Sequence, residues 1–287
     1  MNDTLERRAV AQVLQSQEAP VGTFTVRRAL PERSRHAVGP WVFLDHFGPF
    51  TARDGDGVGA HPHAGIETVT YLLSGRQEHR DSAGHVGIVG PGGAQWMTAG
   101  RGIVHAETPR PLADADREVH GVQMWTSLPR LKKAMAPRYQ NLGAESIAVV
   151  RPDGATVRVI GGIVAGATGP AEALMPLVVA HVTVDPGRTL ALDVPADFEM
   201  GAYVIAGAAR VGDASAGVGE LLVWDPGEGA IAVANPGDAP LEAMVLGGAP
   251  AEGPLVFHGP FVMNTMEQVR AAEVAYRTGR MGALPGA

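Results

Sequence analysis

Short stretches of alternating or continuous apolar residues follow one another along most of the chain. Residues 67–73, 86–89, 95–98 and 103–107 are such stretches, residues 77–80 are a polar segment among them, and turns that contain Gly, Pro, Asp or Ser separate these segments. A period of two residues is typical of half-buried β-strands. Short strands at a spacing of about 8–12 residues are typical of sandwiches and barrels. The pattern therefore predicts an all-β fold.

The second half of the chain repeats the first. Residues 71–75 (YLLSG) recur as residues 203–207 (YVIAG), and the turn at 90–92 (GPG) recurs at 225–227 (DPG). The repetition predicts two similar domains, residues 1–137 and 138–287. The basic segment 128–139 between them is expected to be a helical or extended connector.

Helix character is confined to the end of the chain, over residues 265–276. Asn264 is expected to be the N-cap, because Glu267 follows it three residues later as in a capping box. Gly279 is a suitable C-terminal stop.

Composition narrows the possible classes of protein. The 38 glycines and 22 prolines fit many turns, and the absence of cysteine excludes disulfides, thiolate ligands and cysteine nucleophiles. No apolar run approaches the roughly 18 residues that suggest a membrane helix, and no signal peptide is visible at the N-terminus. The net charge of −7 gives no general basic surface for nucleic acid. We expect a cytoplasmic protein without membrane or direct nucleic-acid contact, a monomer by default.

Two short strings carry the candidate chemistry: His61-Pro62-His63 and His105-Ala106-Glu107. In a strand, residues two apart point to the same face, about 6.6 Å apart along the backbone. Imidazoles at that spacing can converge on one ion with nitrogens about 2.0–2.1 Å from it. Two such strands facing each other predict a metal site of three histidines and one carboxylate. The alternative is a polar rim in which the histidines form hydrogen bonds and Glu107 is solvated.

The ligand types alone do not identify the metal ion. Three imidazoles and one carboxylate suit iron, manganese, cobalt, nickel, copper or zinc. A closed tetrahedral zinc site would be structural. A six-coordinate ion would leave two positions for water, O₂ or substrate, and redox-active iron would then be the useful choice.

Two other motifs are interpreted as turns. Residues 53–57 (RDGDG) resemble a calcium loop but lack its later acidic ligands and its closing Glu. Residues 90–93 (GPGG) are not a phosphate loop, because no Gly-Lys-Ser/Thr follows.

The second copy of the repeat is expected to lack the metal ligands. With the offsets of the two repeated segments, His61 and His63 correspond to Asp193 and Pro195. By the same comparison, His105 and Glu107 correspond to Pro240 and Glu242.

Residues 61–71 (HPHAGIETVTY) and 90–107 (GPGGAQWMTAGRGIVHAE) resemble the signature of the pirin family. Residues 137–140 (PRYQ) and 259–265 (GPFVMNT) add to the resemblance, which covers nearly the whole chain. It implies a bicupin, two jelly-roll-like β-barrels in one chain, with iron in the N-terminal barrel only. The implied ligands are His61, His63, His105 and Glu107, and Glu67 is implied to be structural or to orient the ligands.

The function that this resemblance implies has two forms. Some pirins act as quercetin 2,3-dioxygenases, which open a flavonol ring with O₂ and release carbon monoxide. Glu107 is then the expected catalytic base, with Fe(II) as cofactor and an aromatic or flavonol substrate; Trp96, Met97 and Val104 would either shape the pocket or belong to the core. The alternative is a redox-linked regulator that binds a transcription factor or a metabolic enzyme.

Overall fold

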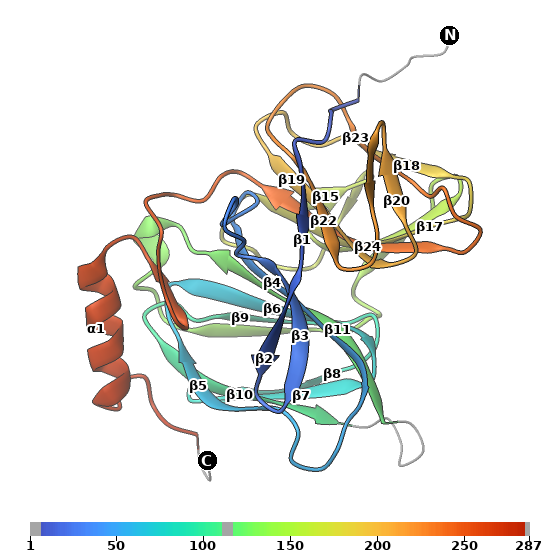
Figure 1. Cartoon of the computed structure of the whole chain (residues 1–287). Helices are drawn as coiled ribbons and strands as arrows, with labels where there is room; N and C mark the ends of the chain where they lie inside the picture. Colours follow the sequence, from blue (N-terminus) through green and yellow to red (C-terminus); the bar gives the residue numbers. More distant parts are fainter. Residues whose placement is uncertain (1–6, 111–116, 285–287) are drawn as a thin grey trace. The chain divides into compact units, whose positions relative to one another are not determined.

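The computed structural model describes residues 7–110 and 117–284, which form two compact units (Figure 1). The first barrel takes its residues from Glu18–Arg28, Val42–Ser146 and Ala251–Ala287. The second barrel takes them from Met1–Gln17, Ala29–Trp41 and Ile147–Pro250. This grouping differs from a single boundary at 137/138, because segments near both ends of the chain pair with the opposite half.

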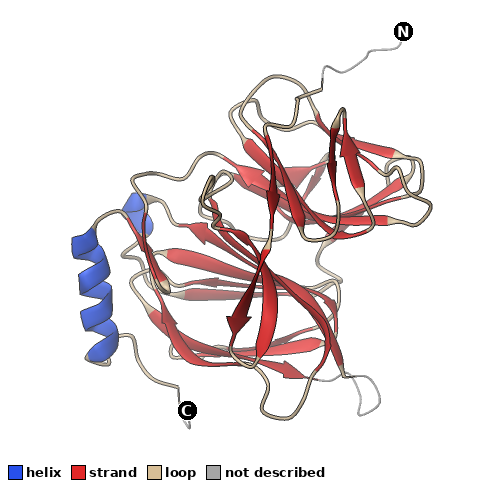
Figure 2. Ribbon diagram, in the orientation of Figure 1, coloured by secondary structure: helices blue, strands red, loops and turns tan. Residues whose placement is uncertain are grey.

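Strands make up nearly all of the regular structure of the described residues (Figure 2). In the first barrel, a four-stranded sheet has the order β5-β10-β7-β8. Its strands are β5 (Val58–His63), β10 (Ile103–Arg110), β7 (Arg76–Asp81) and β8 (Val86–Val89).

A seven-stranded sheet faces it, in the order β12-β9-β6-β11-β4-β3-β2. Its strands are β12 (Arg138–Leu142), β9 (Ala94–Thr98), β6 (Ile66–Ser74), β11 (Glu118–Ser127), β4 (Trp41–Thr51), β3 (Phe24–Leu30) and β2 (Gln17–Val21). Figure 1 shows the two sheets as separate layers of this unit.

The second barrel repeats this plan. Its seven-stranded sheet has the order β1-β22-β19-β24-β17-β14-β13, and its four-stranded sheet the order β18-β23-β20-β21. The first of these comprises β1 (Gln12–Gln15), β22 (Glu220–Trp224), β19 (Glu199–Ala206), β24 (Leu241–Gly248), β17 (Leu177–Val184), β14 (Ala155–Gly161) and β13 (Ala148–Val150). The second comprises β18 (Thr189–Leu192), β23 (Ile231–Ala234), β20 (Ala209–Val211) and β21 (Ala214–Ala216). Two short hairpins complete the strands: β15 (Ile163–Val164) with β16 (Ala167–Thr168), and β25 (Val256–His258) with β26 (Phe261–Met263).

The two strand orders correspond position by position, so the duplication predicted from the sequence is confirmed. The repeated Tyr71 and Tyr203 lie on β6 and β19, the third strands of the two seven-stranded sheets. Both tyrosines are buried. The all-β, two-barrel fold class is likewise confirmed.

The C-terminal helix α1 (Met266–Arg277) is present, but its cap differs from the prediction. Thr265 is the N-cap, and it forms a capping box with Gln268 rather than Asn264 with Glu267. The side-chain amide of Asn264 instead donates to the carbonyls of Glu252 and Pro254. Hydrogen bonding to the preceding loop thus takes Asn264 away from the helix end.

The basic connector contains one short 3₁₀ turn, η1 (Arg130–Lys132), followed by β12, which pairs with β9. Among the described residues, no helix is long and apolar enough to cross a membrane.

Candidate metal centre

Three histidines of the first barrel converge across one pair of strands. β5 and β10 are antiparallel, and their register places His61 opposite His105 and His63 opposite Ile103. One ring nitrogen from each histidine lies within 4.8 Å of one from each of the others. The ring centroids are 4.3–5.0 Å apart. The predicted clustering of His61, His63 and His105 is therefore confirmed, and the three form a candidate metal site.

Each ring uses its Nδ1 for a contact with the protein. Nδ1 of His61 lies 2.7 Å from the carbonyl oxygen of Gly59, and Nδ1 of His63 lies 3.1 Å from that of Pro260. A carbonyl only accepts hydrogen bonds, so both Nδ1 atoms carry a proton, and in the neutral form of each ring Nε2 is the nitrogen with the lone pair. Metal-binding histidines commonly donate their other nitrogen in this way.

The electrostatics also favour neutral imidazoles. Burial, and secondarily His61, lowers the pKa of His63 to about 3. Burial, with His61 and His63 beside it, holds the pKa of His105 well below its usual value. The buried Nε2 of His105 has no hydrogen-bond partner among the described residues. A buried polar atom without a partner is costly unless an ion or water meets it, so these residues fit a bound metal.

Glu107 lies on the same strand as His105 but outside the group of three ring nitrogens. Its buried carboxylate is held by side-chain donors. Oε1 accepts from Gln77 Nε2 at 2.8 Å and lies 2.9 Å from Thr70 Oγ1, whereas Oε2 accepts from Gln123 Nε2 at 2.8 Å. The role of Glu107 as a ligand and as a base stays a prediction.

The remaining residues singled out in the sequence belong to the interior. Trp96, Met97 and Val104 are buried like core residues, as the alternative interpretation had it. Glu67 is fully buried, and its Oε1 accepts from Thr98 Oγ1 at 2.7 Å. Arg138 Nη2 lies 3.6 Å from the same oxygen. These contacts fit the structural role that was expected for Glu67.

Sequence reasoning did not single out the surroundings of the three histidines. His79, on β7, lies next to His105, with 3.4 Å between their Nδ1 atoms. The partly buried Trp125 meets the ring of His63 edge-on at 4.7 Å and stacks on Phe43 at 3.9 Å. One signal for His79 was available: His79-Arg80-Asp81 has the same one-residue spacing as the two ligand strings.

The corresponding strands of the second barrel, β18 and β23, have the sequences TLAL and IAVA and carry no ligand residue. The expected lack of metal binding in the second barrel stays a prediction, and the expected correspondence of positions does not hold. Glu242 lies on β24, which corresponds to β11 rather than to β10. The offset fails because the turn at 90–92 lies between β8 and β9, whereas the turn at 225–227 follows β22, the counterpart of β9, so the two turns are not equivalent.

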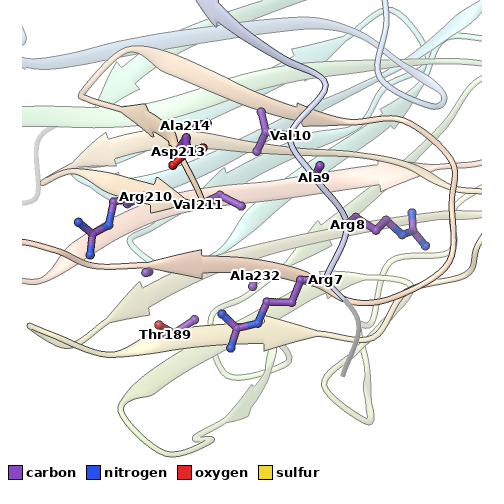
Figure 3. A pocket seen from close by; sticks show the side chains of 12 residues that line it. Arg7, Arg8, Ala9, Val10, Thr189, Arg210, Val211, Asp213, Ala214 and Ala232 are labelled. Carbon is purple, nitrogen blue, oxygen red and sulfur yellow. The ribbon is translucent and has the colours of Figure 1, made fainter. Parts of the chain in front are cut away.

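A hollow of about 780 Å³ lies in the second barrel (Figure 3). Arg7, Arg8 and Arg210 contribute to its lining, together with small apolar residues and Asp213. Arg8 is structural, because its guanidinium donates to the backbone carbonyls of Val194, Pro195, Phe198 and Gly229. None of the predicted metal ligands lines this hollow.

Two stacked-sheet barrels in one chain, with three histidines gathered in the first, define a bicupin with a candidate metal site. The family model described as Pirin matches residues 23–126, and that of the pirin C-terminal cupin domain matches residues 179–282. Pirin of Mus musculus is 34% identical over 262 residues, which cover 90% of this chain and 88% of the mouse protein. The chain belongs to the pirin family.

Solved structures agree with this assignment. A crystal structure of quercetin 2,3-dioxygenase from Acinetobacter baumannii has a TM-score of 0.88 and 30% identity, covering 96% of this chain and 92% of that one. A bacterial pirin of Escherichia coli, solved in complex with nickel(II), has a TM-score of 0.65 and 21% identity, covering 84% of this chain and 99% of that one. The second likeness shows the shared fold.

Proposed function

We propose that this protein is a metal-dependent dioxygenase of the quercetin 2,3-dioxygenase type, with Fe(II) held by His61, His63, His105 and Glu107. The observation that carries the proposal is the convergence of three imidazoles whose Nδ1 atoms are all engaged by the protein. The Acinetobacter baumannii quercetin 2,3-dioxygenase, with its closely similar fold, supports the reaction class.

A bound redox-active ion would supply the open coordination positions and the electron transfer that a reaction with O₂ needs. The protein's part is to hold three imidazoles around one point. The depressed pKa values of His63 and His105 mean that these two rings need no proton loss before they bind an ion.

Glu107 would accept the proton of the flavonol hydroxyl. Oε1 already accepts from Gln77 and lies 2.9 Å from the hydroxyl oxygen of Thr70, whereas Oε2 accepts from one side-chain donor among the described residues, Gln123. A carboxylate oxygen can accept about two hydrogen bonds, so Oε2 is the atom with spare capacity.

Trp125 would form one wall of the substrate site. Its ring lies against His63 and is backed by Phe43, over which Arg28 is placed at 4.6 Å. A flat aromatic substrate packs well against a rigid aromatic wall.

The test is aerobic turnover of quercetin by the iron-loaded protein, measured by loss of flavonol absorbance and by release of carbon monoxide. We expect a chelator and His63→Ala to abolish turnover. His258→Ala is the matched control, because His258 is in the first barrel but its side chain is 54% exposed and pairs with Glu273. Iron-loaded protein that leaves quercetin and related flavonols unchanged would refute the substrate assignment.

A further inference from the structure

His105 differs from the other two histidines of the candidate site in what holds its Nδ1. His61 and His63 face backbone carbonyls, which fix the protonated nitrogen by themselves. Nδ1 of His105 faces Nδ1 of His79 at 3.4 Å. Either nitrogen of a neutral imidazole can carry the proton. Which nitrogen of His105 is free for a metal therefore depends on His79.

His79 in turn depends on Asp81. Nε2 of His79 lies 3.2 Å from Oδ2 of Asp81. A carboxylate only accepts, so Nε2 of His79 carries a proton, and in the neutral ring Nδ1 of His79 is left as an acceptor. His105 then donates from Nδ1, and its Nε2 keeps the lone pair. This is the buried nitrogen without a protein partner.

The side chains of His79 and Asp81 are both held in place by further contacts. The Asp81 side chain is 0% exposed. Its Oδ1 accepts from the backbone N–H groups of Ala83 at 2.9 Å and His85 at 3.0 Å. Its Oδ2 also accepts from Nδ1 of His85 at 2.8 Å. The ring of His79 stacks on Tyr139 at 4.5 Å and 12°. Neither side chain can turn without breaking several contacts.

We propose that His79 and Asp81 are positioning residues that set the tautomer of His105 and thereby present its Nε2 to the metal. The inference rests on the proposed metal site and adds two residues that do not touch the ion. Partners of this kind orient metal ligands, and their loss typically weakens metal binding by about 10- to 100-fold.

Asp81→Asn is the sharpest variant. The two backbone N–H groups keep the amide oxygen at the Oδ1 position, so the amide nitrogen takes the Oδ2 position and faces His79 as a donor. His79 must then accept at Nε2 and carry its proton on Nδ1. His105 must accept at Nδ1, and its proton moves to Nε2, where the metal would bind.

Asp54→Asn is the matched control. It makes the same change of charge in the same barrel, but the Asp54 side chain is 97% exposed and pairs with Arg117. His79→Phe is the second variant, used if Asp81→Asn does not fold. It keeps a ring for stacking on Tyr139 but removes the acceptor of His105.

The first measurement is ¹⁵N NMR of the histidine rings in the metal-free protein, which distinguishes the two tautomers. We expect a proton on Nδ1 of His105 in the wild type and on Nε2 in Asp81→Asn. A wild-type His105 with its proton on Nε2, or an unchanged tautomer in Asp81→Asn, overturns the inference.

The second measurement is the dissociation constant for Co(II), titrated into metal-free protein and followed by visible absorption and calorimetry. We expect a 10- to 100-fold increase for Asp81→Asn and for His79→Phe, and no change for Asp54→Asn. Affinities within twofold of the wild type in both variants overturn the inference. A wild type that binds no Co(II) overturns the proposed metal site instead, and the ¹⁵N spectra then still decide whether Asp81 sets the tautomer.

Discussion

Nδ1 of His63 lies 3.1 Å from the carbonyl oxygen of Pro260, which is 197 positions further along the chain. A candidate metal ligand near the start of the first barrel is thus oriented by the backbone of the last strand pair. The following residues hold that backbone: Phe261 bridges to Ala64, and β26 packs under helix α1. The C-terminal segment is therefore part of the site's support.

The first prediction concerns this support. Val269 on α1 is 0% exposed in the cluster with Phe261 and Met263, and Val269→Ala should destabilise the protein by about 2 kcal/mol through lost burial and a cavity. Val274→Ala is the control on the same helix, because Val274 is 42% exposed. It should change the free energy of unfolding by less than about 0.5 kcal/mol. Urea denaturation measures both, and equal effects would show that α1 does not brace β26.

The second prediction concerns Glu107. Glu107→Gln keeps the shape but puts an amide group where Gln77 and Gln123 both donate, so one donor must face another. If Glu107 is the base, turnover of quercetin should fall by about 10²–10⁴-fold. Glu118→Gln, at an exposed position on β11, should leave turnover unchanged. Wild-type turnover by Glu107→Gln would remove Glu107 from the proposed mechanism.

The third prediction is stabilisation by metal. An ion that binds only the folded state adds about 2.7 kcal/mol when its concentration is about 100 times its dissociation constant. We expect Co(II) to raise the thermal midpoint of the wild type and of His258→Ala. Co(II) should leave the thermal midpoint of His105→Ala unchanged, because this variant lacks one of the three converging imidazoles. An equal rise in His105→Ala would place the ion elsewhere.

The fourth prediction concerns pH and a histidine away from the candidate site. Nε2 of His46 lies 2.6 Å from Nε2 of His120, and burial, followed by His120 and Arg27, lowers the pKa of His46 to about 3. An unfolded histidine has a pKa of about 6.5. Between these values the unfolded chain binds more protons, so stability is lost as the pH falls from 6.5 towards 3.

The loss due to His46 should be about 2 kcal/mol at pH 5. His46→Asn should remove this part of the pH dependence. Urea denaturation at pH 8 and pH 5 gives the difference for both proteins. The same slope in wild type and His46→Asn would show that another group is responsible.

Much of the fold could be predicted because strand alternation and turn residues are local signals. The repeat was visible because Tyr71 and Tyr203 occupy matching central strands. The pairing of distant segments, such as β1 with β22, was not visible, because register between remote strands depends on packing rather than on neighbouring residues. The helix cap was shifted by one residue because Asn264 bonds to a loop that the capping pattern ignores.

The candidate site divides in the same way. His61, His63 and His105 could be predicted because residues two apart on a strand point to the same face, so their spacing in the sequence already indicates that they can converge. His79 and Asp81 share that spacing, but their importance comes from the register that places β7 beside β10. The donors around Glu107 come from β6, β7 and β11, three strands that only the folded sheets bring together.

The four-stranded sheet of the second barrel serves as an internal control for the candidate metal site. Leu190, Leu192, Ile231 and Val233 fill the strands that match those of the histidines. Every chain therefore carries the same backbone framework twice, once with imidazoles and once with aliphatic side chains. A metal titration should saturate at one ion per chain, and exchanging side chains between the two frameworks would separate what the β-scaffold contributes to an ion site from what the histidines contribute.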